Sequence, residues 1–146
     1  MRYTKIKDND VANGVGITMS VWTQGCPHHC EGCFNAETWN FEGGDEFTEK
    51  NLKYVLENID GVLELCREFK SMYPNKKIYL WSGYVFEEFN EKQREILKYV
   101  DILVDGPFQL QSRNLSLTLR GSLNQRVIDV KKTLENNLLV LSSLNS

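Results

Sequence analysis

No stretch of this sequence approaches the roughly 20 consecutive apolar residues that a membrane-spanning helix needs. The first residues, MRYTKIKDND, carry charges where a secretory signal peptide has an apolar run. Basic residues are not in excess, because 17 Lys and Arg stand against 20 Asp and Glu, for a net charge of -3. We therefore expect a cytoplasmic protein that binds neither a membrane nor nucleic acid.

Low-complexity tracts, internal repeats and linkers are also missing from the sequence. Of the 146 residues, 41% are hydrophobic and 25% are charged, which is the balance of a folded globular protein. A chain of this length is long enough to bury one hydrophobic core. We expect a single domain over residues 1–146.

Cysteine is scarce, and three of the four cysteines lie within GCPHHCEGCFN, residues 25–35. These are Cys26, Cys30 and Cys33, with no fourth cysteine near them. Disulfides are rare in a reducing compartment, so three cysteines crowded into one loop favour a metal or cluster site. Cys66 falls on the apolar stripe of a predicted helix and is expected to be a core residue.

The spacing of apolar residues predicts the elements around this loop. A strand over 15–22 runs directly into the cysteines. Helical spacing occurs in 48–59 and again in 63–72, on either side of Asp60-Gly61, which we expect to interrupt the helix. Downstream, the patterns predict strands over 76–83, 101–106 and 138–143 and helices over 86–100 and 131–137.

A strand, a helix and a second strand in succession predict a parallel sheet. Ligands of α/β sheets bind in the loops at the carboxyl ends of the strands. The cysteine loop, Ser82-Gly83 and Asp105-Gly106 all follow predicted strands. We expect these strand ends to converge on one site.

Three thiolates leave a coordination position open. A structural zinc site is closed by four ligands, and a cluster that only transfers electrons is held by four thiolates. A four-iron cluster on three thiolates has one iron that can bind a small molecule. Zinc, with His28 or His29 as a further ligand, is the alternative; otherwise both histidines are exposed loop residues that support an anionic cluster.

The C-x3-C-x2-C spacing after a first strand resembles that of the radical S-adenosylmethionine enzymes. The segments NGVG, TQGCPHHCEGCFNAETW, LWSGY, LVDGPF and RGSLNQRVIDV narrow the resemblance to the activating proteins of anaerobic ribonucleoside-triphosphate reductase. The resemblance covers nearly the whole chain. An activating enzyme of pyruvate formate-lyase would share the cysteines and Asn35, but the RGS-x-NQR segment favours the reductase family.

The resemblance implies a fold and a reaction. The fold is a partial (β/α) barrel of mostly parallel strands. Cys26, Cys30 and Cys33 would hold a [4Fe-4S] cluster whose open iron chelates S-adenosylmethionine. An electron, delivered by a donor such as flavodoxin or ferredoxin, would cleave the sulfonium, and the resulting radical would abstract hydrogen from a glycine of the large reductase subunit.

The same resemblance places further residues near the cofactor. Gly32 leaves room beside the cluster. Phe34 and Asn35 are expected at the nucleoside, and Ser82 and Gly83 at the ribose or carboxylate. Two further cofactor-binding residues are expected: Asp105, at the end of a predicted strand, and Arg120, in the RGS-x-NQR segment. Structural alternatives stay open, because Ser82-Gly83 also suits a turn and Asp105 a helix cap. Arg120 and Arg126 also suit a contact with the partner enzyme or a surface position.

One segment of the family's pattern is absent. The family has a strand that ends in a Gly-Gly-acidic-Pro loop, which binds the methionyl amino group, between its first two helices. Here YVLENID passes directly to GVLELCREF, and Gly43-Gly44 comes too early and follows no predicted strand. Two functions are therefore considered: an active radical-generating enzyme, and a shortened relative that binds a cluster, zinc or the reductase without cleaving S-adenosylmethionine.

Overall fold

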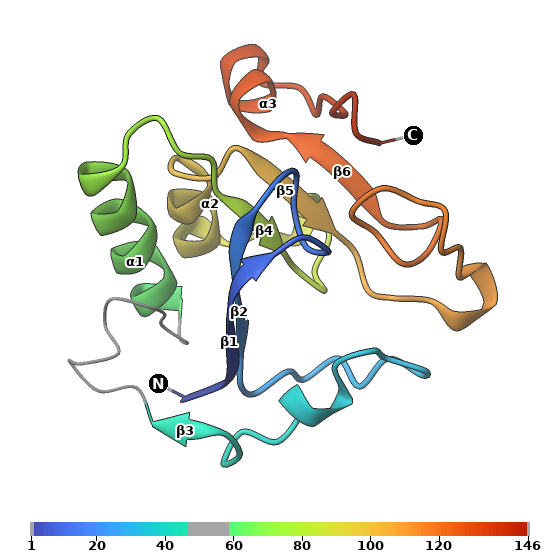
Figure 1. Cartoon of the computed structure of the whole chain (residues 1–146). Coiled ribbons are helices and arrows are strands. Elements are labelled where there is room, and N and C mark those ends of the chain that lie inside the picture. Colours follow the sequence, from blue (N-terminus) through green and yellow to red (C-terminus); the bar gives the residue numbers. More distant parts are fainter. Residues whose placement is uncertain (1, 47–58, 146) are drawn as a thin grey trace.

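The structure is a computed structural model that describes residues 2–46 and 59–145 (Figure 1). Its described strands form two three-stranded sheets, accompanied by α-helices and short 3-10 turns. The strands are β1 (Arg2–Asp10), β2 (Thr18–Thr23), β3 (Asp45–Glu46), β4 (Tyr79–Trp81), β5 (Ile102–Asp105) and β6 (Arg126–Asp129). The helices are α1 (Ile59–Met72), α2 (Glu91–Leu97) and α3 (Val130–Asn136), and the 3-10 turns are Ala36–Thr38, Phe86–Glu88 and Leu110–Ser112.

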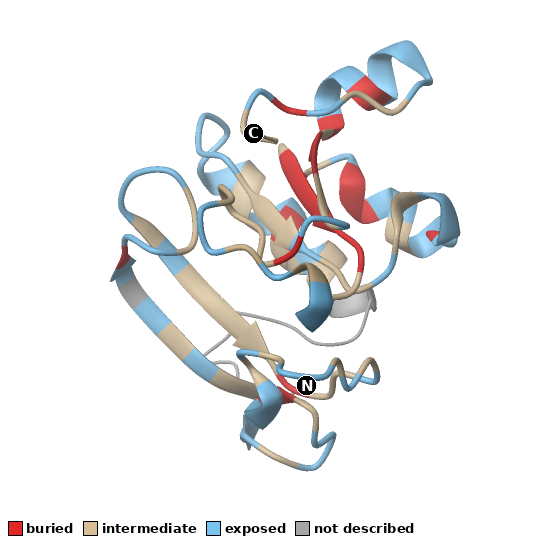
Figure 2. Ribbon diagram, turned by 90° about the vertical axis from the view of Figure 1, so that its right-hand side faces the viewer, coloured by how far each residue is buried: buried red, intermediate tan, exposed pale blue. Residues whose placement is uncertain are grey.

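The first sheet has the order β2-β1-β3 and is antiparallel throughout. Its β1-β2 hairpin is held at the tip by the buried carboxylate of Asp10, which accepts hydrogen bonds from the Ala12 amide and the Asn13 side chain. Hydrogen bonds from Ser20, Asn13 and Lys7 hold the pKa of Asp10 well below its usual range. The hairpin is mostly half-buried or exposed (Figure 2).

The second sheet has the order β4-β5-β6 and carries the hydrophobic core. Strands β4 and β5 are parallel, whereas β5 and β6 are antiparallel. Successive residues of a strand point to opposite faces, so Leu103 and Ile128 pack against the helices while Val104 and Val127 pack on the other side. Figure 2 shows the buried residues gathered in this sheet and its helices.

The predicted α/β class is confirmed, but the described strands form two sheets rather than the predicted partial barrel. The prediction of mostly parallel strands is wrong for them, because only the β4-β5 pairing is parallel. Strand β1 was not predicted: its sequence, RYTKIKDND, lacks a clear apolar face. It pairs with β2 through a short connection, which costs little loop-closure entropy.

Most other elements lie where the sequence predicts them, with closer bounds. The predicted helix over 86–100 divides into the 3-10 turn and α2, which begins with a capping box between Asn90 and Gln93. The predicted last strand over 138–143 is wrong, because Leu141 makes only an isolated bridge to Ile128. The expected interruption at Asp60-Gly61 is also wrong, since both residues lie within α1. The predicted helix over 48–59 lies almost entirely outside the described residues.

None of the described helices is long and apolar enough to cross a membrane.

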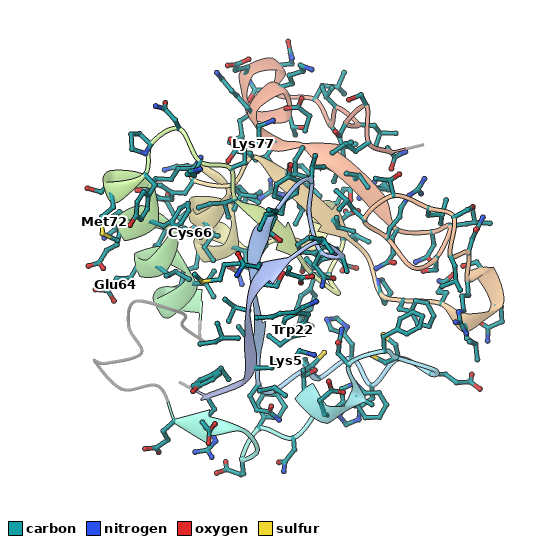
Figure 3. The ribbon with its side chains drawn as sticks, viewed as in Figure 1. Lys5, Trp22, Glu64, Cys66, Met72 and Lys77 are labelled. Atoms are coloured by element: carbon teal, nitrogen blue, oxygen red, sulfur yellow. The ribbon has the colours of Figure 1, made fainter. Side chains whose placement is uncertain are left out.

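Cys66 is a core residue, as the sequence predicts. It lies on the inner side of α1 and is 4% exposed, within the cluster formed by α1, α2 and the second sheet (Figure 3). Glu64 and Met72 of the same helix are exposed. Burial raises the pKa of the Cys66 thiol from 9.0 to about 11, against the opposing influence of Lys70. The thiol is therefore neutral wherever the protein is folded near neutral pH.

This burial predicts a loss of stability at alkaline pH. The unfolded chain ionises Cys66 above pH 9, while the folded chain holds the neutral thiol until about pH 11. The free energy of unfolding should therefore fall between these values, by up to about 2 to 3 kcal/mol at about 1.4 kcal/mol per pKa unit. Urea unfolding from pH 7 to 10.5 measures this. Cys66→Ala should remove the fall in unfolding free energy that ionisation of this thiol causes. An unchanged pH profile in the variant would show that Cys66 is not the cause.

Candidate cluster site

The cysteine loop begins at the carboxyl end of β2 and is fastened at its base. The amides of Gly25 and Cys26 both donate to the carbonyl oxygen of Thr38, at 2.7 and 3.0 Å. Gly25 has a φ of 96°, a conformation that favours glycine, and a Cβ there would lie 2.6 Å from the Phe41 ring. The loop is thus closed onto the 3-10 turn Ala36–Thr38 that follows it.

The three cysteines are half-buried within this loop, and none forms a disulfide. The Cys33 amide donates to the Cys30 carbonyl at 3.1 Å, and the Asn35 amide donates to the Cys33 sulfur at 3.4 Å. Among the described residues, no three His, Cys, Asp or Glu side chains are grouped so that they could hold a metal ion. The loop therefore carries the three thiols in one segment, but their sulfur atoms do not surround a common metal position.

The two histidines of the loop turn toward different partners. His28 packs edge-on against Tyr84, with ring centroids 4.6 Å apart, and His29 stacks on Trp39 at 4.8 Å. Neither ring joins the thiols in a metal-binding group within the described chain. The donor set is therefore three thiols, which fits a cluster with one open iron better than a closed zinc site.

The loop after β4 lies directly against the cysteine loop. A Cβ on Gly83 would lie 2.3 Å from Cδ2 of His28, so the missing side chain lets the imidazole rest on the backbone. The Ser82 amide donates to the Val104 carbonyl at 2.9 Å, and the Ser82 hydroxyl accepts from the Tyr84 amide at 3.1 Å. These bonds form the turn that presents Gly83.

The loop after β5 covers the other side of the cysteines. Phe34 contacts Phe108 at a centroid distance of 5.4 Å, and the guanidinium of Arg113 lies 5.0 Å from the Phe34 ring. A Cβ on Gly32, whose φ is 69°, would lie 2.9 Å from Leu110. The predicted convergence of the three strand-end loops is therefore seen in the structure.

Asp105 is fully buried at the end of β5, and its ion-pair partner is Arg126. The Arg126 Nε donates to Asp105 Oδ1 at 3.0 Å, and the Phe86 amide donates to Oδ2 at 2.7 Å. Arg126 also donates to both carboxylate oxygens of Glu87. The hydrogen bonds to Asp105 and then Glu87 raise the pKa of Arg126, and the bond from Arg126 lowers the pKa of Glu87.

Arg120 holds the C-terminal segment in place. Its Nη1 donates to the Gln125 carbonyl at 2.7 Å and its Nη2 to the Asn145 carbonyl at 2.8 Å. Asn35 contributes its backbone: the amide reaches the Cys33 sulfur, and the carbonyl accepts from the amide and hydroxyl of Thr38. The predicted residues thus divide into those beside the cysteines and those, Asp105 and Arg120, that hold the surrounding loops.

Comparison with known proteins identifies the family to which the chain belongs. The family described as a 4Fe-4S single cluster domain matches the chain over residues 12–61 and 54–128. The anaerobic ribonucleoside-triphosphate reductase-activating protein of Vibrio cholerae is 31% identical, over 86% of this chain and 96% of the relative. The chain belongs to this activating-protein family.

Other members of the activating-protein family match to a similar extent. Those of Enterobacteria phage T4 and Escherichia coli K12 are 34% and 29% identical, over 87% of this chain in both cases and over 93% and 97% of the relatives. No solved structure matches the chain.

The family match is divided near the segment that the sequence analysis identifies as shortened. Its two parts overlap at residues 54–61. The alignment with the Vibrio cholerae relative spans 148 residues but holds only 86% of this chain, about 126 residues, so about 20 residues of that family member have no counterpart here. These findings agree with a deletion near the start of α1.

Several residues of the site were not predicted from the sequence. Phe108, Leu110 and Arg113 pack on the cysteine loop from a segment without clear periodicity. Trp39 packs on His29 of the loop, and an aromatic residue close after a cysteine loop is a signal for such packing. Tyr84, which directly follows the predicted strand over 76–83, gave a similar signal.

The close approach of Gly83 to His28 predicts a coupled effect of substitution. Gly83 does not have a positive φ, so alanine suits its backbone and only the His28 ring opposes it. Gly83→Ala should lower the free energy of unfolding by about 1 to 3 kcal/mol. In a His28→Ala background the same change should cost almost nothing. Urea unfolding of the wild type, the two single variants and the double variant gives the coupling free energy between the two positions. Equal losses of stability from Gly83→Ala in both backgrounds would contradict the contact.

Proposed function

We propose that this chain is a radical S-adenosylmethionine enzyme that generates the glycyl radical of an anaerobic ribonucleoside-triphosphate reductase. One observation carries the proposal: in a member of the activating-protein family, a C-x3-C-x2-C loop at the end of β2 lies against the loops that follow β4 and β5. Three thiols in such a loop suit a cluster that keeps one iron open.

In this proposal Cys26, Cys30 and Cys33 hold a [4Fe-4S] cluster. When bound, the cluster supplies the electron that cleaves S-adenosylmethionine. The chain's own contribution is positional. The Asn35 amide donates to the Cys33 sulfur, a hydrogen bond that helps to orient this ligand.

The cofactor-binding residues are proposed on the same loops. Gly32 and Phe34 lie beside the cysteines, and Ser82 and Gly83 lie on the adjoining turn. Asn35 is proposed at the nucleoside. Asp105 and Arg120 act indirectly in this proposal, because their polar atoms bind the chain itself.

The partners follow from the same assignment. The large subunit of the reductase carries the glycine, and a small electron-transfer protein such as flavodoxin or ferredoxin reduces the cluster. A cytoplasmic location and a single domain over residues 1–146 belong to the proposal, as does the absence of membrane and nucleic-acid partners.

The partial barrel of the family is proposed as the parent arrangement of the two sheets. Strands β2 and β4 are the terminal strands of their sheets. One parallel strand inserted between them would join the two sheets. The division of the family match at residues 54–61, which lie between β2 and β4 in the sequence, supports this proposal.

A second candidate function is a shortened relative with impaired catalysis. The observation that favours it is the same division of the family match at residues 54–61. Such a protein would bind the cluster or the reductase but would cleave S-adenosylmethionine slowly, because contacts to its amino group would be missing.

Radical formation tests the first function. Anaerobically reconstituted protein, mixed with the reductase, S-adenosylmethionine and a strong reductant, should give a glycyl radical doublet in electron paramagnetic resonance. Replacing any one of Cys26, Cys30 and Cys33 with alanine should abolish both the iron and the doublet, since a thiolate ligand is lost. Cys66→Ala is the matched control and should keep both. A doublet with pyruvate formate-lyase in place of the reductase would refute the partner, and bound zinc without iron would refute the cluster.

Restoring the missing segment separates the two functions. We expect the chain to bind S-adenosylmethionine at least about 10-fold more weakly than a variant with a strand and a Gly-Gly-Asp-Pro loop inserted before Ile59, since each factor of ten corresponds to about 1.4 kcal/mol. Calorimetry with cluster-loaded proteins measures this, with cluster-free proteins as the control. Equal affinities would show that other residues supply the amino-group contacts.

A further inference from the structure

Two buried side-chain nitrogens have no hydrogen-bond partner among the described residues, the Nε1 of Trp39 and the Nε of Arg120. Arg120 satisfies its other nitrogens with backbone carbonyls. Trp39 has only one polar atom, so its whole hydrogen-bonding capacity is unused. A buried donor without an acceptor is unfavourable and is rare in folded proteins. The indole N–H therefore calls for an acceptor that residues 2–46 and 59–145 do not supply.

Trp39 is held at the base of the cysteine loop by the turn that precedes it. Its amide donates to the Ala36 carbonyl at 3.2 Å, and its neighbour Thr38 accepts the amides of Gly25 and Cys26. At the other end of the same turn, Asn35 bonds to the Cys33 sulfur. The segment that carries the indole is thus bonded to both the first and the last cysteine residue.

The indole ring also faces the cysteine loop. It stacks on His29, with ring centroids 4.8 Å apart and an interplanar angle of 27°. His29 immediately precedes Cys30. The unused donor therefore belongs to a ring packed on the segment that carries the three thiols.

The other two tryptophans lie in different surroundings. The Trp81 indole donates to the Leu119 carbonyl at 2.8 Å. Trp22 lies on the hairpin with Lys5 over its ring, 4.4 Å from the centroid (Figure 3). Neither contacts the cysteine loop through an interaction seen here, so Trp22 offers a matched control for the loss of an indole.

We propose that the Trp39 indole N–H donates a hydrogen bond to a sulfur atom of the cluster held by Cys26, Cys30 and Cys33, and that this bond raises the cluster's reduction potential. The inference rests on the proposed function only in requiring that cluster. Cluster sulfurs accept N–H hydrogen bonds, and such bonds stabilise the reduced form because it carries one more negative charge. In this role Trp39 acts only through the cluster and contacts neither the substrate nor S-adenosylmethionine.

The test is a redox titration of reconstituted protein without S-adenosylmethionine or reductase, followed by electron paramagnetic resonance. Trp39→Phe should lower the reduction potential, while Trp22→Phe should leave it unchanged. Replacing Trp39 with L-3-benzothienylalanine, which keeps the ring system and removes the N–H, should lower the potential as Trp39→Phe does. If Trp39→Phe disturbs the loop and lowers the iron content, the reduction potential of the benzothienylalanine variant tests the proposed hydrogen bond instead.

A second readout separates this role from a structural one. Without the cluster, the benzothienylalanine variant should be at least as stable to urea as the wild type, because no bond within the chain is lost. Resonance Raman spectra should show a smaller shift of the Fe–S stretching bands on exchange into D2O than in the wild type. Unchanged potentials in the iron-loaded variants would overturn the inference and leave the proposed function intact. Failure of the wild type to hold any cluster would overturn both.

Discussion

The close packing of the cysteine loop on glycine backbone is the constraint on which the arrangement of this protein depends. His28 rests on Gly83, Leu110 approaches Gly32, and Phe108 lies against Gly121, where a Cβ would lie 3.1 Å from its ring. A side chain at any of these glycines would push the loops apart. Because packed interiors leave little free space, these contacts fix the distance between the hairpin that carries the cysteines and the loops of the second sheet.

The loops of the second sheet are in turn fixed by a buried ion pair. Asp105 is fully buried, and its charge is offset by Arg126 and by the Phe86 amide. The pair adds little net stability, because the Asp105 carboxylate loses its solvation. Removing the partly exposed Arg126 would leave an uncompensated buried charge. Its effect here is geometric, since it joins the end of β5, the start of β6 and the turn after β4. Arg126 extends the join to Glu87, whose carboxylate is more exposed.

The sequence predicted the elements whose signals are local. Strands β4 and β5, helix α1 and the core position of Cys66 follow from apolar spacing alone, and the cysteine loop follows from its residue types. The partners of the charged residues could not be predicted, because the pairing of Arg126 with Asp105 depends on the antiparallel register of β5 and β6. The hairpin was missed because β1 depends on a neighbouring strand and on the buried Asp10 cap, neither of which leaves a periodic pattern.

The separation of the two sheets follows from which strand edges are paired. In the described chain β2 bonds only to β1, and β4 bonds only to β5. Among the described residues no backbone ladder crosses from the hairpin to the second sheet, and the connection between them rests on side-chain packing. Such contacts are weaker and less cooperative than a ladder of backbone hydrogen bonds, so the hairpin and the cysteine loop should open at lower free energy than the core around Leu103. A cluster bound to three thiolates would add bonds within the loop, and ligand binding to the folded form alone shifts this local equilibrium toward the closed arrangement. The geometry of the site thus depends more strongly on the cluster itself.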